Sequence, residues 1–304
     1  MTLREACEKG KGALAEAGIA EAGLDAWYLL EHVTGITRTL YFAEPEKEID
    51  EEQFGGYMAL IKKRAEHIPL QHLTGEQEFM GLPFRVSRDV LIPRQDTETL
   101  VETALELIEK ERVPAQDGTL RLLDLCTGSG CILISLLYHM KKKGLPSAAG
   151  CAESGADVYG AGADISEAAL AVAGENAARH QVQAQFVCGD LFENIRGTYG
   201  MILSNPPYIR TSEIERLQEE VRLHDPVRAL DGKEDGLYFY RRIVKESRQY
   251  LEKGGILIFE IGYDQARDVM GLMEESGFSG IQVRTDLAGL DRVVCGRYDN
   301  EWKG

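Results

Sequence analysis

The sequence predicts an α/β fold, in which a mixed, mostly parallel sheet follows a small all-helical N-terminal domain and a β-hairpin linker. Three observations predict it. Residues 1 to 67 carry helical patterns alone, residues 67 to 93 carry short extended runs, and helix and strand patterns alternate from Thr97 onwards. Strands that alternate with helices form a mostly parallel sheet with both faces covered. A chain of 304 residues is long enough for about two domains at roughly 150 residues each.

The N-terminal part is predicted to be helical from its caps and its apolar spacing. Thr2 and Glu5 have the spacing of a capping box. Leu24 and Asp25 open a second helix over "AWYLLEHV". Apolar residues at helical spacing indicate a third helix, namely Phe54, Tyr57, Met58, Ile61 and Ala65. The acidic stretch Glu44–Glu52 is interpreted as a solvated corner and helix start, with partner binding as the alternative.

The segment between His67 and Pro93 is predicted to be extended. The runs "EQEFM" and "FRVS" flank the turn residues of "GLP", and two short runs with turn residues between them indicate a β-hairpin. We therefore place a helical domain at residues 1–75, a hairpin linker at 76–92 and the sheet-containing domain at 93–304.

Helix and strand patterns follow one another through the second domain. Predicted helices cover residues 97–111, 132–142, 166–180, 237–251 and 264–277. Predicted strands cover residues 120–125, 157–164, 184–190, 199–205, 255–262, 281–286 and 292–298. Residues 141–156 are rich in Gly, Ala and Ser, and we interpret them as a surface insertion.

Charge and composition exclude several classes of protein. The formal net charge is -16, from 34 basic and 50 acidic residues, which argues against a surface that wraps a phosphate backbone. We therefore expect no direct nucleic-acid binding, and a basic or neutral protein partner is favoured. No apolar run approaches the roughly 20 residues of a membrane span, and the start of the chain lacks the apolar core of a signal peptide. A soluble, cytoplasmic and monomeric protein is expected.

The cysteines give no sign of a metal site. None forms a C-x-x-C pair, and no His stands near them at ligand spacing, so reduced thiols and no metal are expected. The six cysteines are Cys7, Cys126, Cys131, Cys151, Cys188 and Cys295.

The stretch "DLCTGSGC" carries the first candidate site. A predicted strand stops at Leu125, and Gly128 and Gly130 let the backbone approach a ligand closely before the next helix. The third Gly of a dinucleotide-binding pattern is absent, and Asp124 closes the strand instead. An acidic group beside a glycine loop suits a cationic ligand without phosphate, such as S-adenosylmethionine, which carries an ammonium and a sulfonium.

Two more strand ends complete a candidate cofactor site, because ligands of such sheets bind beyond the carboxyl ends of strands. Asp164 can accept two charge-assisted hydrogen bonds from ribose hydroxyls. The alternative for Asp164 is a helix N-cap, a role that Ser166 could fill. In "GDLF", Asp190 could reach an adenine amino group and Leu191 could pack on the ring, with a simple Gly-Asp turn as the alternative.

The stretch "ILSNPPYIR" suggests the chemistry. Asn205 follows a strand and offers a side-chain acceptor, while Pro206 and Pro207 lack backbone donors, so the Pro206 carbonyl can point at a ligand. Tyr208 supplies a flat aromatic face. Together these residues suit a planar NH2 group held by two acceptors; a merely rigid turn is the alternative.

Such a group is hard to methylate because its lone pair is delocalised, as in a peptide bond. Acceptors that stabilise positive charge growing on the nitrogen help, and preorganised groups of this kind contribute about 3 to 4 kcal/mol each. Alignment of nitrogen and methyl can contribute on the order of 7 to 11 kcal/mol. The pattern therefore predicts methyl transfer to an amino or amide nitrogen.

These residues resemble class I (Rossmann-like) S-adenosylmethionine-dependent methyltransferases that act on NH2 groups and share an Asn/Asp-Pro-Pro-aromatic motif. The whole chain is similar to the bacterial peptide chain release factor glutamine methyltransferases. The similarity lies in "PLQHLTGEQEFMGLPFRVSRDVLIPRQDTETLVE", "DLCTGSGC", "DIS", "NPPYI" and "DPVRALDGKEDGLYFYRRI". It implies an N-terminal domain that helps to dock the release factor, and a C-terminal domain that methylates the Gln side chain of its Gly-Gly-Gln loop, leaving S-adenosylhomocysteine.

The resemblance also assigns residues. It implies cofactor contacts from Cys126, Thr127, Gly128, Ser129, Gly130, Asp164, Leu191 and Asn205. It implies a substrate site made of Asn205, Pro206, Pro207 and Tyr208. The chain departs from the family at Cys126, where Gly is usual, at Leu191, where Trp is common, and at Asp225, where Glu is usual. Arg94 and Glu98 also match, with a structural role at the domain junction as the alternative.

Two other functions remain open from the sequence. An adenine amino-group methyltransferase acting on DNA or RNA uses the same Asn-Pro-Pro-Tyr chemistry, but it needs phosphate contacts and usually a target-reading domain, against which the acidic composition argues. A non-catalytic protein that only senses the cofactor would leave Asn205 unexplained.

Overall fold

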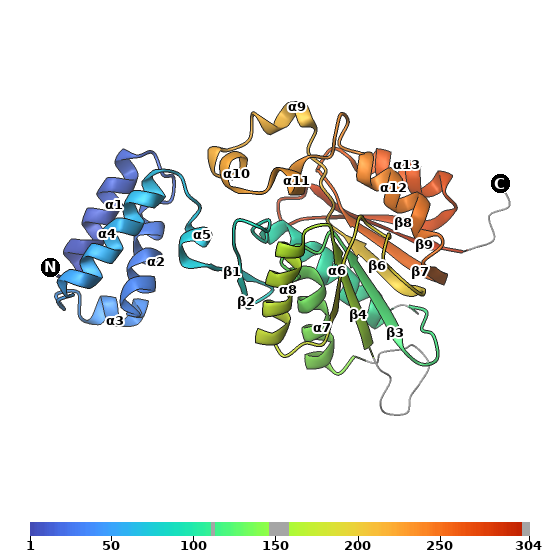
Figure 1. Ribbon diagram of the computed structural model, residues 1–304, viewed down its shortest axis with the longest axis horizontal. Helices are drawn as coiled ribbons and strands as arrows, with labels where there is room; N and C mark the ends of the chain where they lie inside the picture. The colour runs from blue at the N-terminus through green and yellow to red at the C-terminus, as the bar shows by residue number, and fades with distance from the viewer. Residues whose placement is uncertain (111–112, 146–157, 300–304) are drawn as a thin grey trace. The chain divides into compact units, whose positions relative to one another are not determined.

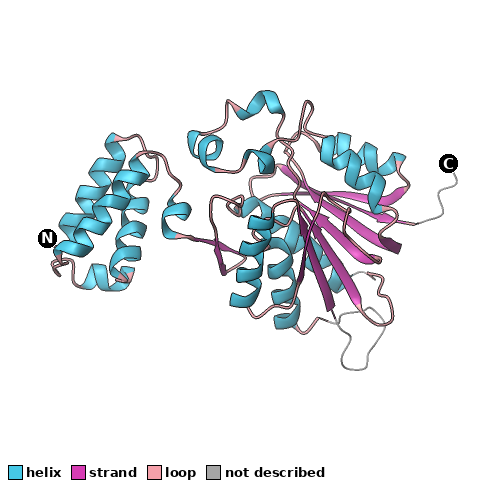
Figure 2. Cartoon of the chain, in the orientation of Figure 1, coloured by secondary structure: helices cyan, strands magenta, loops and turns pink. Residues whose placement is uncertain are grey.

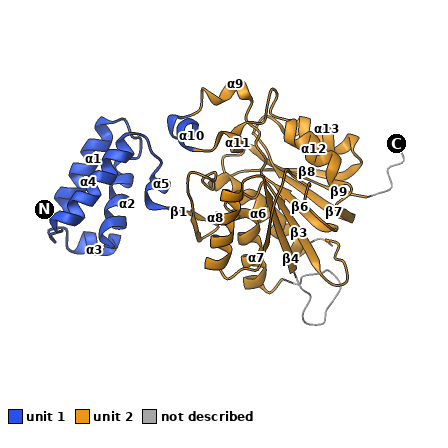
Figure 3. Ribbon diagram, viewed as in Figure 1, with its two compact units in different colours: residues 1–76, 218–224 blue, residues 77–217, 225–304 orange. Residues whose placement is uncertain are grey.

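The chain forms two compact units. The computed structural model describes residues 1–110, 113–145 and 158–299 (Figure 1). Helices make up the N-terminal part, and strands and helices alternate in the rest (Figure 2). Unit 1 contains Met1–Glu76 and Gln218–His224, and unit 2 contains Gln77–Leu217 and Asp225–Gly304 (Figure 3). The predicted fold class is confirmed, while the exact domain boundaries proposed from the sequence stay a prediction.

Unit 1 is all-helical. Its helices are α1 (Leu3–Glu16), α2 (Ala22–Thr34), α3 (Arg38–Ala43), α4 (Glu51–Ala65), α5 (Leu70–Thr74) and α10 (Glu219–His224). The capping box predicted at Thr2 and Glu5 is present, and Asp50 and Gln53 form a second one at the start of α4. Leucine, isoleucine and aromatic side chains from α1, α2 and α4 form the core of this unit.

A buried ion pair lies beside this core. Arg64 Nε donates to Asp25 Oδ2 at 2.6 Å, and Arg64 Nη2 donates to Glu220 Oε1 at 2.6 Å. Burial raises the pKa of Asp25, against the lowering effect of Arg64. The helix α10, although distant in sequence, is held in unit 1 by this arginine.

The predicted hairpin is present as β1 (Glu76–Phe79) and β2 (Leu82–Arg85). Met80 and Gly81 between them both have positive φ, at 54° and 71°, the conformation of a two-residue hairpin turn. The Met80 amide donates to Glu98 Oε1 at 2.6 Å. Glu98 therefore holds the hairpin turn, which is the structural role weighed for it from the sequence.

The sheet of unit 2 has seven strands in the order β5-β4-β3-β6-β7-β9-β8. Five neighbouring strands pair in parallel, β9 runs antiparallel to β7, and the edge strand β8 pairs antiparallel with β9, so that β9 alone among these seven is reversed. The strands are β3 (Leu120–Leu125), β4 (Val158–Asp164), β5 (Gln185–Cys188), β6 (Tyr199–Ser204), β7 (Leu251–Glu260), β8 (Phe278–Thr285) and β9 (Asp291–Tyr298). Strand order reverses between β3 and β6, and that switch point is where open α/β sheets bind ligands.

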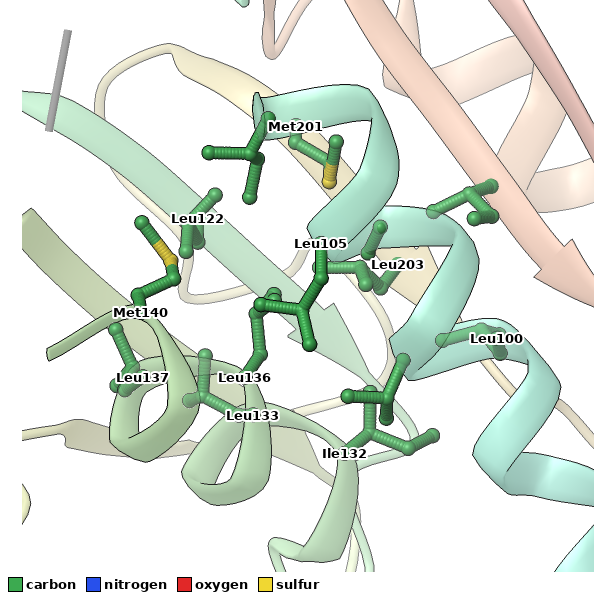
Figure 4. Packing of buried hydrophobic residues seen from close by; sticks show 14 of the residues in the cluster. Leu100, Leu105, Leu122, Ile132, Leu133, Leu136, Leu137, Met140, Met201 and Leu203 are labelled. Carbon is green, nitrogen blue, oxygen red and sulfur yellow. The ribbon is translucent and has the colours of Figure 1, made fainter. Parts of the chain in front are cut away.

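Helices cover both faces of the sheet. They are α6 (Glu98–Lys110), α7 (Cys131–Lys143), α8 (Glu167–Arg179), α12 (Tyr238–Ser247) and α13 (Ala266–Glu275), with the short elements η1 (Gln95–Thr97), α9 (Thr211–Ile214) and α11 (Val227–Leu230). Leu122, Met201 and Leu203 pack against α6 and α7 on one face (Figure 4). Leu123 and Ile202, one position along the same strands, pack with the α12 and α13 cluster on the other. This alternation explains why these strands are apolar on both sides.

Two further expectations from the sequence concern the insertion at residues 141–156 and membrane-spanning segments. Of the interpreted insertion at residues 141–156, residues 146–156 lie outside the described part of the chain. No helix among the described residues is both long and apolar enough to cross a membrane.

Candidate active site

A cavity opens at the carboxyl edge of the parallel strands. Its lining includes loops after β3, β4, β5 and β6, together with the segment before α6 and the segment around α11. The candidate residues in this lining are Cys126, Thr127, Gly128, Ser129, Asp164, Asp190, Leu191, Asn205 and Pro207. Asp124, Gly130, Pro206 and Tyr208 lie outside it. Strand ends far apart in the chain thus meet at one site because the strands are parallel and in register.

The loop between β3 and α7 has a backbone that few residues adopt. Cys126, Gly128 and Gly130 all have positive φ, at 59°, 53° and 78°. A side chain at position 130 would be strained by the positive φ, and its Cβ would lie 2.7 Å from Ile134 Cδ1 and 3.1 Å from Ala173 Cβ, so glycine is favoured there. Cys126 is a non-glycine residue in a left-handed conformation, which costs about 1 to 2 kcal/mol. The departure noted at Cys126 therefore falls at a strained position beside the cavity.

Two carboxyls hold this loop. Asp124 is fully buried at the end of β3, and Thr127 Oγ1 donates to its Oδ2 at 2.6 Å. Burial raises the pKa of Asp124 to about 7, a shift that the Thr127 hydrogen bond opposes and the Asp164 charge reinforces. Asp164 accepts the Gly128 amide at 3.0 Å and the Ser166 amide at 2.9 Å. A carboxylate with such partners is fixed in place and retains lone pairs for a ligand.

The N-cap alternative for Asp164 can be compared with the structure. The side chain of Ser166 caps α8 by accepting the Ala169 amide at 3.3 Å. Ser166 therefore fills the capping role, and Asp164 lines the cavity. Ribose binding by Asp164 stays a prediction.

We expect Asp164→Ala to weaken S-adenosylmethionine binding by at least about tenfold, because a hydrogen bond to a charged group contributes about 1.5 to 3 kcal/mol. Calorimetric titration of the cofactor measures this. Asp50→Ala is the control: it removes the acidic N-cap of α4 in unit 1, so it should lower stability and leave affinity unchanged. Equal affinity in Asp164→Ala and wild type would make Asp164 a purely structural residue.

The loop after β5 contributes Asp190 and Leu191. Both oxygens of Asp190 accept hydrogen bonds from Arg242 Nη1, at 3.0 and 2.9 Å. Leu191 has positive φ, at 55°, and is 5% exposed, so it presents an apolar side chain at the cavity. Arg242 was not considered from the sequence, and any contact of Asp190 with adenine has to coexist with this ion pair.

Asn205 and Tyr208 are held by residues from elsewhere in the chain. Asn205 Nδ2 donates to Thr97 Oγ1 at 3.5 Å, and Tyr208 Oη donates to Glu260 Oε1 at 3.3 Å. Burial raises the pKa of Tyr208 well above its usual range. The phenol is therefore neutral and packs on the apolar cluster of α12 and α13, while its predicted contact with substrate stays a prediction.

Sequence reasoning missed Glu260 and Thr97. Glu260 ends β7 and is 2% exposed, and Thr97 is 3% exposed. Burial raises the pKa of Glu260 to about 7, against the lowering effects of the nearby Thr97 hydroxyl, the charge of Arg292 and the hydrogen bond from Tyr208. The signal available was the charged residue in an otherwise apolar strand, "GILIFEIG".

The segments before α6 and around α11 also form part of the cavity wall, and the sequence alone did not assign them to the cofactor or the substrate site. Arg94 Nη2 donates to Asp225 Oδ2 at 2.5 Å, and the Asp225 side chain is completely buried. Burial raises the pKa of Asp225, and the Arg94 charge opposes this. Arg94 thus ties two segments that both contribute to the lining. In the sequence, these two segments were marked by the family resemblance alone, in "IPRQDTE" and "DPVRAL".

The lining fits S-adenosylmethionine. The accessible carboxylate of Asp164 suits a ribose, and the apolar side chain of Leu191 suits an adenine ring. Gly128 has open space at its Cα, which lets a ligand approach the backbone closely. Within residues 1–110, 113–145 and 158–299, no three His, Cys, Asp or Glu residues are placed to hold a metal ion. The cysteines in those ranges are free thiols.

Comparisons with known proteins agree with this geometry. The family model described as the PrmC N-terminal domain matches residues 5–75, and the methyltransferase small domain matches residues 104–224. The catalytic domain of hMettl16, solved with the MAT2A 3'UTR hairpin 6, is 14% identical with a TM-score of 0.54, over 79% of this chain and 82% of that chain. A similarity at that identity supports the fold alone.

Curated relatives match almost end to end. The release factor glutamine methyltransferase of Geobacter sulfurreducens is 39% identical over 297 residues, covering 97% of this chain and 96% of the relative. The enzyme of the same name from Agrobacterium fabrum is 39% identical and covers 93% of each chain. At this identity and coverage, with the glycine loop and Asn205 on one cavity, the chain belongs to the release factor glutamine methyltransferase family.

Proposed function

We propose that this protein transfers a methyl group from S-adenosylmethionine to the side-chain amide nitrogen of the Gln in the Gly-Gly-Gln loop of peptide chain release factors. The observation that carries the proposal is the position of Asn205 on the same cavity as the glycine loop and Asp164. S-adenosylhomocysteine is the other product, no metal takes part, and the protein acts as a cytoplasmic monomer.

In this proposal the cofactor supplies an electrophilic methyl group. Asn205 Oδ1 and the Pro206 carbonyl accept the two N-H groups of the glutamine amide. Of this motif, Asn205 and Pro207 line the cavity. As the nitrogen lone pair turns toward the methyl, positive charge grows on nitrogen, and the two acceptors stabilise it. The methylated nitrogen then releases one of its two protons, which leaves a neutral amide. Tyr208 covers the amide, and Asp164, Asp190, Leu191 and the loop Cys126–Gly130 bind the cofactor.

Labelled methyl transfer tests the function. The acceptors are a release factor, its Gln→Ala loop variant, and adenine-containing DNA and RNA. Label is expected on the factor and absent from the Gln→Ala variant. Label on nucleic acid alone would refute the proposal and favour the adenine methyltransferase.

The helical domain is proposed to dock the release factor. Removing residues 1–75 should then lower kcat/KM for the intact factor much more than for a short peptide containing the Gly-Gly-Gln loop. The physical reason is that a peptide lacks the surface that a docking domain would contact. Both acceptors are measured with the same truncated protein, and its cofactor affinity checks that the site is intact. An equal loss with factor and peptide would contradict the docking role.

A further inference from the structure

The side chains predicted to handle the substrate converge on one buried carboxyl. Glu260 Oε1 accepts the hydrogen bond of Tyr208, and the Glu260 backbone carbonyl accepts that of Tyr240 at 2.9 Å. The Thr97 hydroxyl lies close enough to the same carboxyl to lower its pKa and accepts from Asn205 Nδ2 at 3.5 Å, while the buried Oε2 of Glu260 has no hydrogen-bond partner among the described residues. Glu260 itself lies outside the lining of the cavity, so its influence on the substrate passes through its neighbours.

The number of protons available for hydrogen bonds between Glu260, Thr97 and Asn205 decides which end of the Asn205 amide faces the cavity. A carboxylate only accepts hydrogen bonds, and a threonine hydroxyl has one proton to donate. If Thr97 donates that proton to Glu260, its oxygen can only accept from Asn205. The NH2 end of Asn205 must then face Thr97, which leaves Oδ1 as the end available to the cavity. An asparagine in the opposite orientation would present a donor to the substrate NH2 and repel it.

We propose that Glu260 is a positioning residue, which through Thr97 holds the Asn205 amide with its oxygen available to the substrate and directly holds Tyr208. This inference rests on the proposed function, because it explains how that site keeps an acceptor aimed at an NH2 group. The buried carboxylate is explained as well: an apolar residue at position 260 would leave both Thr97 and Tyr208 without this partner.

The arrangement depends on the charge of Glu260. A protonated carboxyl could donate to Thr97, whose hydroxyl would then donate to Asn205 and turn the amide around. Because the pKa of Glu260 lies at about 7, kcat should fall as the pH decreases through that region. The charged and titratable groups that face Glu260 are Arg292, Asp96, Tyr208, Tyr240 and Cys131.

Two nearly isosteric substitutions test the inference. Glu260→Gln and Thr97→Val are each expected to lower kcat about 10²-fold, the scale of a misplaced catalytic group, with cofactor affinity unchanged. Thr97→Ser, which retains the hydroxyl, should recover most of the loss. Thr103→Val is the matched control, because Thr103 is a buried threonine of α6 whose hydroxyl donates to the Thr99 carbonyl. Glu260→Gln should also lose the acid limb of the pH profile.

Normal kcat in Glu260→Gln, or equal losses in Thr97→Ser and Thr97→Val, would overturn the inference. Neutron diffraction of the deuterated wild type observes the Asn205 amide directly and does not depend on turnover. An NH2 group facing the cavity there would also overturn it. If the wild type transfers no methyl to a release factor while Asn205 shows the stated orientation, the proposed function fails and the positioning network stands.

Discussion

Asn205→Ala is expected to lower kcat for methyl transfer by about 10²- to 10³-fold, the loss seen when one preorganised polar group is removed from a transition state. The side chain lines the cavity and is held by Thr97, so it is fixed before the substrate arrives. Its oxygen contributes most when charge grows on nitrogen, and the effect should therefore appear in kcat. Transfer of labelled methyl to a release factor measures it.

Cofactor affinity separates this loss from a general collapse of the site. The loop proposed to bind the cofactor is held by Asp124, Asp164 and Asn176, none of which is hydrogen-bonded to Asn205. Calorimetry should therefore find near-normal S-adenosylmethionine binding in Asn205→Ala. Turnover close to wild type would remove Asn205 from the mechanism.

Arg64→Ala is expected to lower the free energy of unfolding of unit 1 by about 3 to 5 kcal/mol, as when one partner of a buried ion pair is removed. Asp25 is 6% exposed, and without Arg64 it would keep a buried charge with no cation beside it. The variant also removes the ion pair that holds Glu220 and α10. Denaturant unfolding of the full chain measures the change.

The pH dependence of this loss has a definite sign. Removing Arg64 raises the folded-state pKa of Asp25 further, because the cation now lowers it. Below about pH 3 the Asp25 carboxyl is protonated in both the folded and the unfolded state, so the loss should be smallest there and grow as the pH rises. Lys62→Ala, an exposed change on the same helix, should stay within about 0.5 kcal/mol. A loss in Arg64→Ala no larger than that would contradict the prediction.

Much of the fold could be predicted because its signals are local. The strands at residues 120–125 and 199–204 stand out as short apolar runs, and α1 and α4 begin at capping boxes. The helices α3, α5, α9, α10 and α11 were missed. Each has six residues or fewer, and fewer than two turns leave little helical periodicity to read. The strand β7 also begins at Leu251, before the predicted residue 255.

The sequence by itself determined the fold class, the glycine loop and the Asn-Pro-Pro-Tyr motif, because each depends on neighbours within a few residues. Only the tertiary structure decided what holds these groups. Glu260 meets Tyr208 across 52 positions, and Arg94 meets Asp225 across 131. Such pairs form where parallel strand ends and their loops pack together, so no local pattern marks them. The buried carboxyl of Glu260, which accepts from Tyr208, belongs to that second class.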